Sequence, residues 1–538
     1  MATSDDTSIL EETERSSGRA ALRKNVQAAM ALAGAVRSTL GPKGLDKLLL
    51  DDEGRIQVTN DGVTVLEAAK VQHPTARMLI SSSSTQDRVA RDGTTSTVLI
   101  TAEMLQNAWD LVNQGVHPTV IAAGYRLAES QSQIILEEIS QNLKSEKEIL
   151  QATQTCLAGK GESSLQGTLS VLAAEAAAAI AEQGEDGIKA DPTRIKVLAN
   201  KGGQSSETHL VNGIVIAKRP AHPEMEGSLG GGNILVIDGA LERRQMVMDA
   251  KLKITSAGML QAFRDKEHKM LKDSIDAVEA LGVDILVVRD GIDDYARSML
   301  EARGITAYRR VERNDLEQIC ITTGATMVHS ANTASAKDIG SFSSSRQELW
   351  SDTSHWILEG STNKGQTLIT RGSSEEMLEE VERCFADALG VACQLHEEPK
   401  LLPGGGATQV ALARRLRRYG ETIPGREQLA VEAFADALEV IPRALAENAG
   451  LDSLGNLLEL TAAQTNAEDD WLGLDLRNGT ISNMDEVGIR EPLRISRQAI
   501  KGATDSAIAV LRIDDILWAK QDAQVPDEVQ QRLDEQYG

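Results

Sequence analysis

The stretch VDILVVRDG, residues 283–291, is a short apolar run that ends in Arg-Asp-Gly. A run of this length, bounded by turn residues, is typical of a β-strand. Three further runs of the same kind are separated by helical segments: ILVID (234–238), ITAYRRV (305–311) and ATMVHS (325–330). This alternation predicts an α/β module with a largely parallel sheet.

The segments on either side of this module have the pattern of long amphipathic helices, from about residue 19 to 150 and from about 405 to 530. The clearest apolar stripe recurs at spacings of three and four residues: Phe434, Leu438, Ile441 and Leu445. Core packing explains such a stripe without a cofactor. Pro442 should kink or divide this helix, and Gly450 is a natural stop. We predict one helical body that the α/β module interrupts.

A segment longer than a minimal crossover, residues 240–282, separates the first two strand-like runs. Part of it is predicted to project from the sheet as an extra helical element that carries Met259, Leu260 and Phe263. The alternative, in which these side chains pack on the sheet, fits their periodicity equally well.

Composition limits the class of protein. The chain has 538 residues, 41% of them hydrophobic, which is enough for several domains with cores. Its net charge of −24 disfavours nucleic acid or an anionic membrane as a general partner. The N-terminus lacks the features of a signal peptide, and no apolar run of about 18 residues occurs. Four cysteines without CxxC or Cys/His spacing fit a reduced compartment, so a cytoplasmic location is expected: Cys156, Cys320, Cys384 and Cys393.

The stretch RDGTTSTVLI, residues 91–100, is the first candidate for a chemical site. It places Asp92, Gly93 and two threonines before an apolar helix, whose N-terminus would offer unpaired N–H groups and a positive dipole end to an anion. The Asp92 carboxylate is a hard oxygen ligand of the kind that Mg²⁺ prefers. The alternative is an ordinary capped helix, because Asp and Thr are common caps.

Three other turns have a backbone that a ligand could approach closely. TLGPKG bends at Gly41 and Pro42, and TNDG bends at Asp61, where a plain hairpin or helix cap is the default interpretation. PGGGA opens a helix with Gly405 and Gly406. None matches the P-loop pattern GxxxxGK[ST], and SLGGGN precedes a strand, which is the wrong order for a dinucleotide fingerprint. Any nucleotide site must be assembled differently.

Taken in order, these stretches resemble the group II chaperonins, the thermosome and eukaryotic cytosolic type, over nearly the whole chain. The motifs are TLGPKGLDKLL, VTNDGVTVLE, DGTTS, LAGKGE, PGGGA, REQLAVEAFADALEVIPRALAENAGLD, and EPLRISRQAI followed by LRIDDIL. Each alone is weak, but the ordered set is specific. The resemblance implies an archaeal, ATP-dependent chaperone subunit. Identical or homologous subunits would form a back-to-back double ring that encloses and folds non-native polypeptides.

The resemblance also implies a multidomain fold. A mainly α-helical equatorial domain would occupy residues 1–145 and 403–538. A small intermediate hinge domain would occupy 146–216 and 369–402, and an α/β apical domain with a helical protrusion, the built-in lid, would occupy 217–368. Closure of the intermediate domain onto the nucleotide is expected to complete the site and to swing the lid shut.

Position by position, the resemblance implies ATP and Mg²⁺ as cofactors. Asp92 matches the magnesium-binding aspartate, and Asp61 and Asp387 match two carboxylates that position and activate the attacking water. Lys160 in LAGKGE matches a lysine that senses the terminal phosphate, and Glu491 in REPLR matches an acid near the ribose and base. The other positions expected to line the nucleotide are Gly41, Pro42, Gly93, Thr94, Thr95, Ser96, Gly405 and Gly406. Without the resemblance, Lys160 and Glu491 would be ordinary exposed residues and Asp387 a solvated helix residue.

Some positions depart from the family pattern. Arg91 stands where glycine is usual, Gln409 where glutamate is common, and the end RLDEQYG lacks a glycine- and methionine-rich tail. An alternative is therefore a chaperonin-like subunit with weakened ATPase that acts mainly in a mixed ring. A third hypothesis is an unrelated α/β nucleotide-using enzyme. The matched carboxylates favour an active ATPase, and the sheet module offers only the isolated His329 and His355, which disfavours the third hypothesis.

Arg91 itself has two explanations. If the backbone there needs a positive φ, an arginine costs about 1 kcal/mol relative to glycine. If it does not, the guanidinium lies near the phosphates or pairs with a neighbouring acid. We expect the second, because the acidic chain offers partners.

Overall fold

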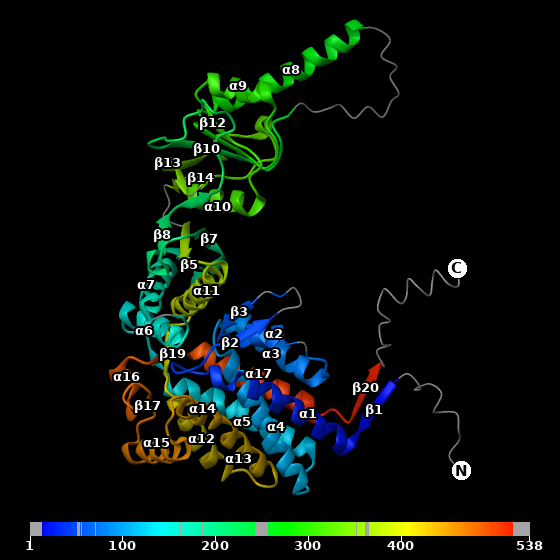
Figure 1. Ribbon diagram of the computed structural model, residues 1–538, viewed down its shortest axis with the longest axis vertical. Helices are drawn as coiled ribbons and strands as arrows, with labels where there is room; N and C mark the ends of the chain where they lie inside the picture. The colour runs from blue at the N-terminus through cyan, green and yellow to red at the C-terminus, as the bar shows by residue number, and fades with distance from the viewer. Residues whose placement is uncertain are drawn as a thin grey trace, which may run out of the picture. The chain divides into compact units, whose positions relative to one another are not determined.

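The computed structural model (Figure 1) describes residues 13–50, 54, 56–69, 71–161, 163–185, 187–242, 257–350, 352–360 and 365–519. The chain forms two compact units. The first combines the segments up to residue 143 and from residue 400 onward, and the second is the continuous segment 144–399. The protein is therefore multidomain, with an interrupted first unit. The finer five-part division stays a prediction.

Helices make up most of the first unit, as predicted. They are α1 (Gly18–Val36), η2 (Arg37–Thr39), α2 (Gly62–Ala68), α3 (Pro74–Ala90), α4 (Thr94–Asn113), α5 (Pro118–Ile139), α12 (Ala407–Gly420), α13 (Glu427–Leu438), α14 (Val440–Asn448), α15 (Ser453–Ala467), α16 (Met484–Val487) and α17 (Leu493–Leu511). Their apolar faces meet in one large core, to which α4 and α13 contribute many of the fully buried side chains. Burial of these stripes, more than helix propensity, stabilises the helices.

The stretch around Pro442 is divided into two helices, as one form of the prediction stated. Leu438 ends α13 and Val440 begins α14, so Pro442 lies in the first turn of α14. N–H groups in a first turn have no acceptor within the helix, so the proline costs no helical hydrogen bond there. Gly450 follows α14 with φ 73°. The predicted stripe is buried in the core: Phe434, Leu438, Ile441 and Leu445.

Short antiparallel strands complete the first unit, and two of their sheets join segments that are distant in the sequence. They are β1 (Thr13–Ser17) with β20 (Asp515–Ala519), β2 (Lys47–Leu50) with β3 (Ile56–Thr59), β17 (Leu472–Asp475) with β18 (Thr480–Asn483), and the sheet of β19 (Arg490–Pro492), β16 (Lys400–Pro403) and β4 (Gln141–Asn142). In the last of these, Glu491 pairs with Leu402. This pairing brings the REPLR and PGGGA motifs together.

The second unit mixes helices and strands. Its helices are α6 (Glu146–Leu157), α7 (Ser163–Ile180), η3 (Pro192–Arg194), η4 (Ser205–Glu207), α8 (Ala257–Ala280), α9 (Asp294–Ala302), α10 (Arg313–Thr323), η5 (Ala331–Thr333) and α11 (Glu375–Glu397). Its strands are β5 (Ala181–Gly184), β6 (Gly187–Ala190), β7 (Ile195–Lys201), β8 (His209–Asn212), β9 (Ile214–Ile216), β10 (Gly232–Ile237), β11 (Ile285–Val288), β12 (Thr306–Tyr308), β13 (Gly340–Trp350), β14 (Thr353–Gly360) and β15 (Gln366–Gly372).

A six-stranded sheet, in the order β12-β11-β10-β13-β14-β9, forms the α/β part of this unit. Successive residues of β10 and β11 face opposite sides, where α8 and α9 cover one face and α10 the other. The predicted strands at β10, β11 and β12 are present and parallel. The prediction of a largely parallel sheet is wrong, because β13, β14 and β9 pair antiparallel.

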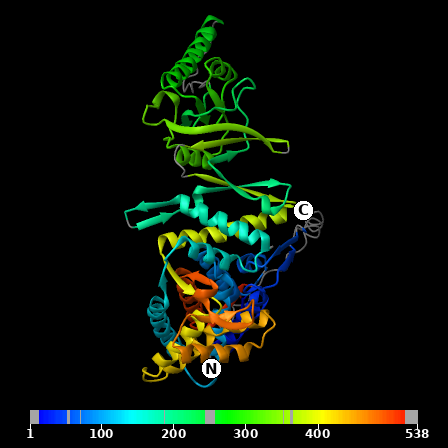
Figure 2. The same cartoon turned by 90° about the vertical axis from the view of Figure 1, so that its left-hand side faces the viewer.

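The predicted strand at 325–330 is also absent. Only Val328 bridges to Ile237, because β13 pairs along the remaining edge of β10. The second, smaller sheet has the order β7-β15-β8. The long helices α7 and α11 pack together nearby (Figure 2).

Helix α8 is the predicted helical protrusion. Its C-terminal half packs on the sheet through Leu271, Ile275 and Val278, while its N-terminal half extends beyond the sheet in Figure 1. The side chains of Met259, Leu260 and Phe263 lie outside the described residues, so their predicted roles stay predictions.

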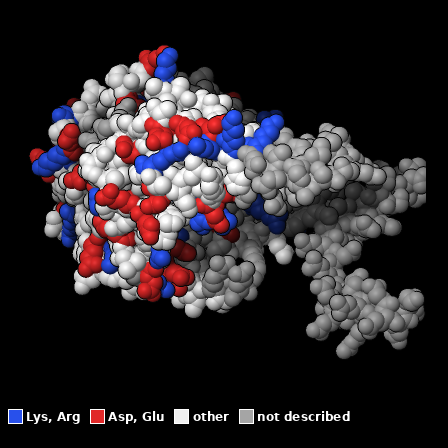
Figure 3. Space-filling view, turned by 90° about the horizontal axis from the view of Figure 1, so that it is seen from above, with Lys and Arg blue, Asp and Glu red and all other residues white. Residues whose placement is uncertain are grey.

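On the face seen from above in Figure 3, acidic and basic side chains are interspersed among uncharged residues. None of the helices in the described part of the chain combines the length and apolar character needed to span a bilayer.

Candidate functional site

The N-terminus of α4 has the geometry of an anion site. Gly93 precedes the helix in a left-handed conformation (φ 79°), and no described side chain caps this end of α4. The backbone N–H groups of Thr94, Thr95 and Ser96 have no carbonyl partner within the helix, since the carbonyls four residues earlier lie outside it. The helix end therefore presents N–H groups and a positive dipole end to an anion.

Asp61 begins a second helix beside the first. Its Oδ2 accepts hydrogen bonds from Thr64 N at 2.9 Å and Thr64 Oγ1 at 2.6 Å, so the helix-cap interpretation of TNDG is correct. A methyl group on Gly62 would come within 2.4 Å of Thr95 Oγ1. Only glycine at this position lets the starts of α2 and α4 approach this closely.

Asp92 and Glu491 lie near each other at the same end of α4. The amide of Gln86 on α3 donates to Asp92 O at 2.8 Å and to Ile495 O at 3.2 Å, which ties the DGTTS turn to α17. Burial raises the pKa of Glu491, a hydrogen bond from Ser496 at 2.7 Å lowers it, and the negative charge of Asp92 raises it, so that together they bring the pKa to about 7. The Glu491 carboxyl thus changes charge near neutral pH.

The two glycine turns pack against the same short helix, α14. A methyl group on Gly406 would lie 2.8 Å from Pro442 Cβ, and one on Gly41 would lie 2.3 Å from Leu445 Cδ2. Both glycines have positive φ, 75° and 83° respectively. The Asn448 amide at the end of α14 donates to Leu40 O at 2.9 Å and fixes the turn at Gly41 and Pro42.

The first unit therefore brings its candidate residues together. Gly62 joins α2 to α4, Gln86 joins the turn at Asp92 to α17, and β19 pairs with β16 just before the turn at Gly405 and Gly406. That turn and the turn at Gly41 share α14. The described part of the chain holds no group of three or more His, Cys, Asp or Glu side chains suited to a metal ion.

Lys160 and Asp387 belong to the second unit and pair with each other. Lys160 Nζ lies 2.8 Å from Asp387 Oδ2, and the two side chains are 18% and 16% exposed, so this is a largely buried ion pair. Gly159 and Gly161 have φ of 94° and 66°, and Gln166 donates to Lys160 O at 3.1 Å. The loop is thus held in a defined shape, and Asp387 is not the fully solvated helix residue that its motif alone suggested.

Arg91 corrects one expectation. It ends α3 in the left-handed region with φ 56°, and its N–H donates to Asp87 O at 2.8 Å. The expectation of a backbone without positive φ is wrong, because the tight turn between α3 and α4 holds Arg91 in the left-handed region. The placement of its guanidinium stays a prediction.

Sequence reasoning missed the residues that hold the candidate groups in place. Thr64 fixes Asp61, Gln86 fixes the turn at Asp92, and Ser496 binds Glu491. Gln86 had a usable signal, because it lies on the same helical stripe as Leu79 and is buried with it. A polar residue on a buried stripe indicates a specific hydrogen-bonding role.

Comparison with known proteins gives one consistent result. Residues 32–521 match the TCP-1/cpn60 chaperonin family. A thermosome subunit of Pyrococcus horikoshii is 40% identical over 512 residues, which cover 95% of this chain and 93% of that protein. The thermosome subunit alpha of Archaeoglobus fulgidus is 41% identical over 526 residues (97% and 96%), and the thermosome subunit beta of Thermoplasma acidophilum is 38% identical over 515 residues (95% and 95%).

Proposed function

Since the chain belongs to the TCP-1/cpn60 chaperonin family, we propose that it hydrolyses ATP with Mg²⁺ and couples this reaction to the folding of non-native polypeptides. The protein is a group II chaperonin subunit of archaeal type. The ATPase activity, the cofactors, the site residues and the cytoplasmic location are our proposals.

One observation carries the proposal: the N-terminus of α4, which no described side chain caps, lies beside Gly62 and the turn at Asp92, and the glycine turns at Gly41 and Gly406 of the same unit pack on α14. The N–H groups of Thr94, Thr95 and Ser96, with the threonine hydroxyls, suit phosphate oxygens. Gly93 and Gly405 keep the neighbouring backbone free of side chains. Thr94, Thr95, Ser96, Gly41, Pro42, Gly93, Gly405 and Gly406 would line the nucleotide, and Glu491 would lie near its ribose and base.

The residues present fit Mg²⁺. Magnesium usually binds one or two protein carboxylates and completes its shell with water and phosphate oxygens. Asp92, partly exposed beside the anion-binding helix end, can supply one such carboxylate. When bound, the ion would offset negative charge on the phosphate oxygens.

Two carboxylates are assigned to the hydrolytic step. Thr64 holds Asp61 through Oδ2, which leaves Oδ1 able to accept a proton from a water molecule and to orient it. Asp387 is assigned with Lys160 on the strength of the family match. Their ion pair supports a shared role, because it holds both side chains at one place in the second unit.

Assembly with identical or homologous subunits is also a proposal. The hairpin of β2 and β3 exposes large apolar side chains, since Leu48 and Leu50 are 68% and 69% exposed and Ile56 is 54% exposed. An apolar hairpin of this kind marks a contact surface for another protein chain. It supports a multi-subunit assembly, for which we propose a back-to-back double ring.

The alternative of a subunit with weakened ATPase is less favoured, because the assigned carboxylates and threonines are all present. The hypothesis of an unrelated α/β metabolic enzyme is wrong, because the family match covers residues 32–521.

The test measures phosphate release by the purified protein with ATP, in Mg²⁺ and after its removal by a chelator, together with the mass of the assembly. We expect Mg²⁺-dependent hydrolysis by a particle of many subunits. A multi-subunit particle without ATPase activity would favour the weakened subunit, and a monomer without activity would overturn the proposal.

A further inference from the structure

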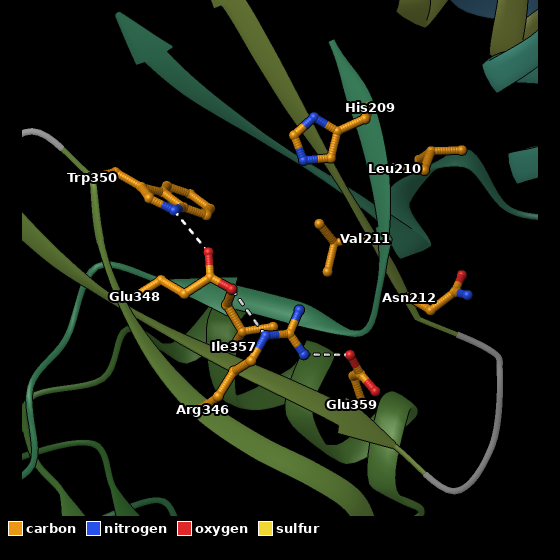
Figure 4. Close-up of a pocket in the computed structure, with 9 residues that line it drawn as sticks. All are labelled: His209, Leu210, Val211, Asn212, Arg346, Glu348, Trp350, Ile357 and Glu359. Atoms are coloured by element: carbon orange, nitrogen blue, oxygen red, sulfur yellow. Dashed lines mark hydrogen bonds and ion pairs between the residues drawn. The ribbon is translucent and has the colours of Figure 1, made fainter. Parts of the chain in front are cut away.

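A groove in the second unit has no role in the proposed ATPase site. It has a volume of about 370 Å³ and lies between strand β8 and the hairpin of β13 and β14 (Figure 4). One wall is the segment His209–Asn212, and the other consists of side chains from the hairpin. These two walls differ in the kind of group that they present.

The β8 wall is the edge of a strand. Successive side chains of a strand point to opposite faces, so a groove over one face would contact every second residue. Here four consecutive residues, His209–Asn212, line the groove. β8 ends the sheet order β7-β15-β8, and β15 is its one strand partner among the described strands. The groove therefore runs along an edge that can accept a further strand.

The opposite wall is one face of the hairpin. Arg346, Glu348 and Trp350 alternate along β13, and Arg346 pairs in register with Ile357 on β14. Arg346 donates to Glu348 at 2.9 Å and pairs with Glu359 at 2.5 Å, and the Trp350 indole N–H donates to Glu348 at 3.0 Å. Figure 4 shows these groups converging on the groove.

This wall carries a net negative charge. Partial burial raises the pKa of Glu348, but hydrogen bonds from Arg346 and Trp350 outweigh this effect, so the net shift of its pKa is downward. The hydrogen bond from Arg346 also lowers the pKa of Glu359. Both carboxylates are therefore ionised at neutral pH, and a single guanidinium balances only one of them. Their side chains stay 40% and 35% exposed, so a ligand can reach them.

We propose that an extended polypeptide segment adds to the edge of β8 and presents a lysine or arginine side chain to Glu348 and Glu359. Main-chain hydrogen bonds to β8 would hold the segment. Every second side chain of the added strand would face the hairpin, where Val211 and Ile357 give an apolar floor and Trp350 can pack against the aliphatic stem of a basic side chain. The inference rests on the proposed function because it names a binding place for the non-native polypeptides that the protein would fold. Binding at this place requires no ATP.

The test titrates the full-length protein, without nucleotide, with a fluorescein-labelled peptide of about ten residues, long enough to span a strand, that alternates valine with lysine. The matched probe alternates valine with glutamate. We expect fluorescence anisotropy to show binding of the lysine peptide and at least tenfold weaker binding of the glutamate peptide. Equal binding of both peptides would overturn the inference.

Two variants and a modified peptide locate the site. Glu348→Gln and Glu359→Gln should each weaken binding of the lysine peptide up to about fivefold, the most that an exposed ion pair usually contributes. Glu224→Gln, which removes an exposed carboxylate of the same unit outside the groove, should leave it unchanged. Methylation of the peptide's backbone nitrogens should abolish binding, since it removes the donors to β8.

Unchanged binding in both groove variants, or full binding of the methylated peptide, would overturn the inference. ATP hydrolysis is measured on the same samples. Peptide binding without hydrolysis would count against the proposed ATPase alone, whereas hydrolysis without selective peptide binding would count against the groove alone.

Discussion

The candidate residues of the two units are built in different ways. In the first unit, glycines with positive φ pack tightly: Gly41 and Gly406 contact α14, and Gly93 contacts α17. In the second unit, two charged side chains, Lys160 and Asp387, pair on a loop and a helix. The first arrangement depends on backbone shape and the second on charge. Substitutions should therefore disturb fold and binding together in the first unit but chemistry alone in the second.

The largest effect is expected for Asp387→Ala. It should lower ATP turnover by on the order of 10³-fold, because it removes a carboxylate assigned to activation of the attacking water. Assembly should stay intact, since the Asp387 side chain is partly exposed (16%) and alanine favours the helix α11. Phosphate release and native mass spectrometry check both parts. A monomer whose ATPase activity is unchanged would contradict both the comparison between the two units and the assignment of Asp387 to water activation.

A backbone change in the first unit comes next. Gly406→Val should cost about 2–3 kcal/mol of stability, because φ is 75° and a side chain would press on Pro442. ATP affinity, measured by calorimetry, should fall with it. Gly420→Ala in the same helix is the control, since its added methyl group would lie 3.5 Å from Val431, an ordinary contact. If Gly406→Val lowered the ATP affinity without lowering the stability, the expectation that first-unit substitutions disturb fold and binding together would be wrong.

Glu491→Gln tests a charged residue within the first unit. The folded-state pKa of about 7 lies above the ordinary value of 4.5, so the folded protein favours the protonated form. The stability contributed by this proton is complete below pH 4.5 and is lost as pH rises through about 7. The variant should therefore be more stable than the parent by ~3 kcal/mol at pH 8 and similar to it at pH 4.

Chemical denaturation at the two pH values, without Mg²⁺, measures this difference. Glu486→Gln, a change at an exposed neighbour, should show no such pH dependence. An equal effect of Glu491→Gln at both pH values would mean that the burial of Glu491 does not control its protonation.

The smallest effect is expected for Arg91→Gly. Glycine should raise the free energy of unfolding by about 0.5–1 kcal/mol, because two effects oppose each other. Glycine removes the strain of an arginine in the left-handed region, and this gain exceeds the entropy that glycine adds to the unfolded chain. Arg310→Gly, at φ 54° in the other unit, should gain about as much. ATP affinity and its salt dependence should stay unchanged in Arg91→Gly. A weaker and less salt-dependent ATP affinity would show that the guanidinium acts on the nucleotide after all.

Much of the fold could be predicted from local patterns. The division at Pro442 and the stripe from Phe434 to Leu445 follow from residue chemistry within one or two turns of helix. The strands β10, β11 and β12 were recognisable as continuous apolar runs. The antiparallel strand β13 was not, because GSFSSSRQELW is mostly polar and its place depends on pairing with β10 and β14.

The candidate site divides in the same way. Motif order alone named Asp61, Asp92, Glu491 and the glycine turns, and their roles stay proposals. Their neighbours Thr64, Gln86 and Ser496 could not be assigned from motifs, because a hydrogen bond such as that from Gln86 to Ile495 joins residues 409 positions apart.

The sequence by itself determined the helical body, the inserted α/β module and the motifs that identify the family, because periodicity and turn residues act over a few positions. Only the tertiary structure decided the left-handed backbone of Arg91, the mixed sheet, the pairing of Lys160 with Asp387 and the open edge of β8. The mixed sheet, the ion pair and the open edge of β8 depend on what packs against a segment from far along the chain, which no local pattern encodes. The backbone of Arg91 follows from the tight turn between α3 and α4, whose geometry the residue type did not predict.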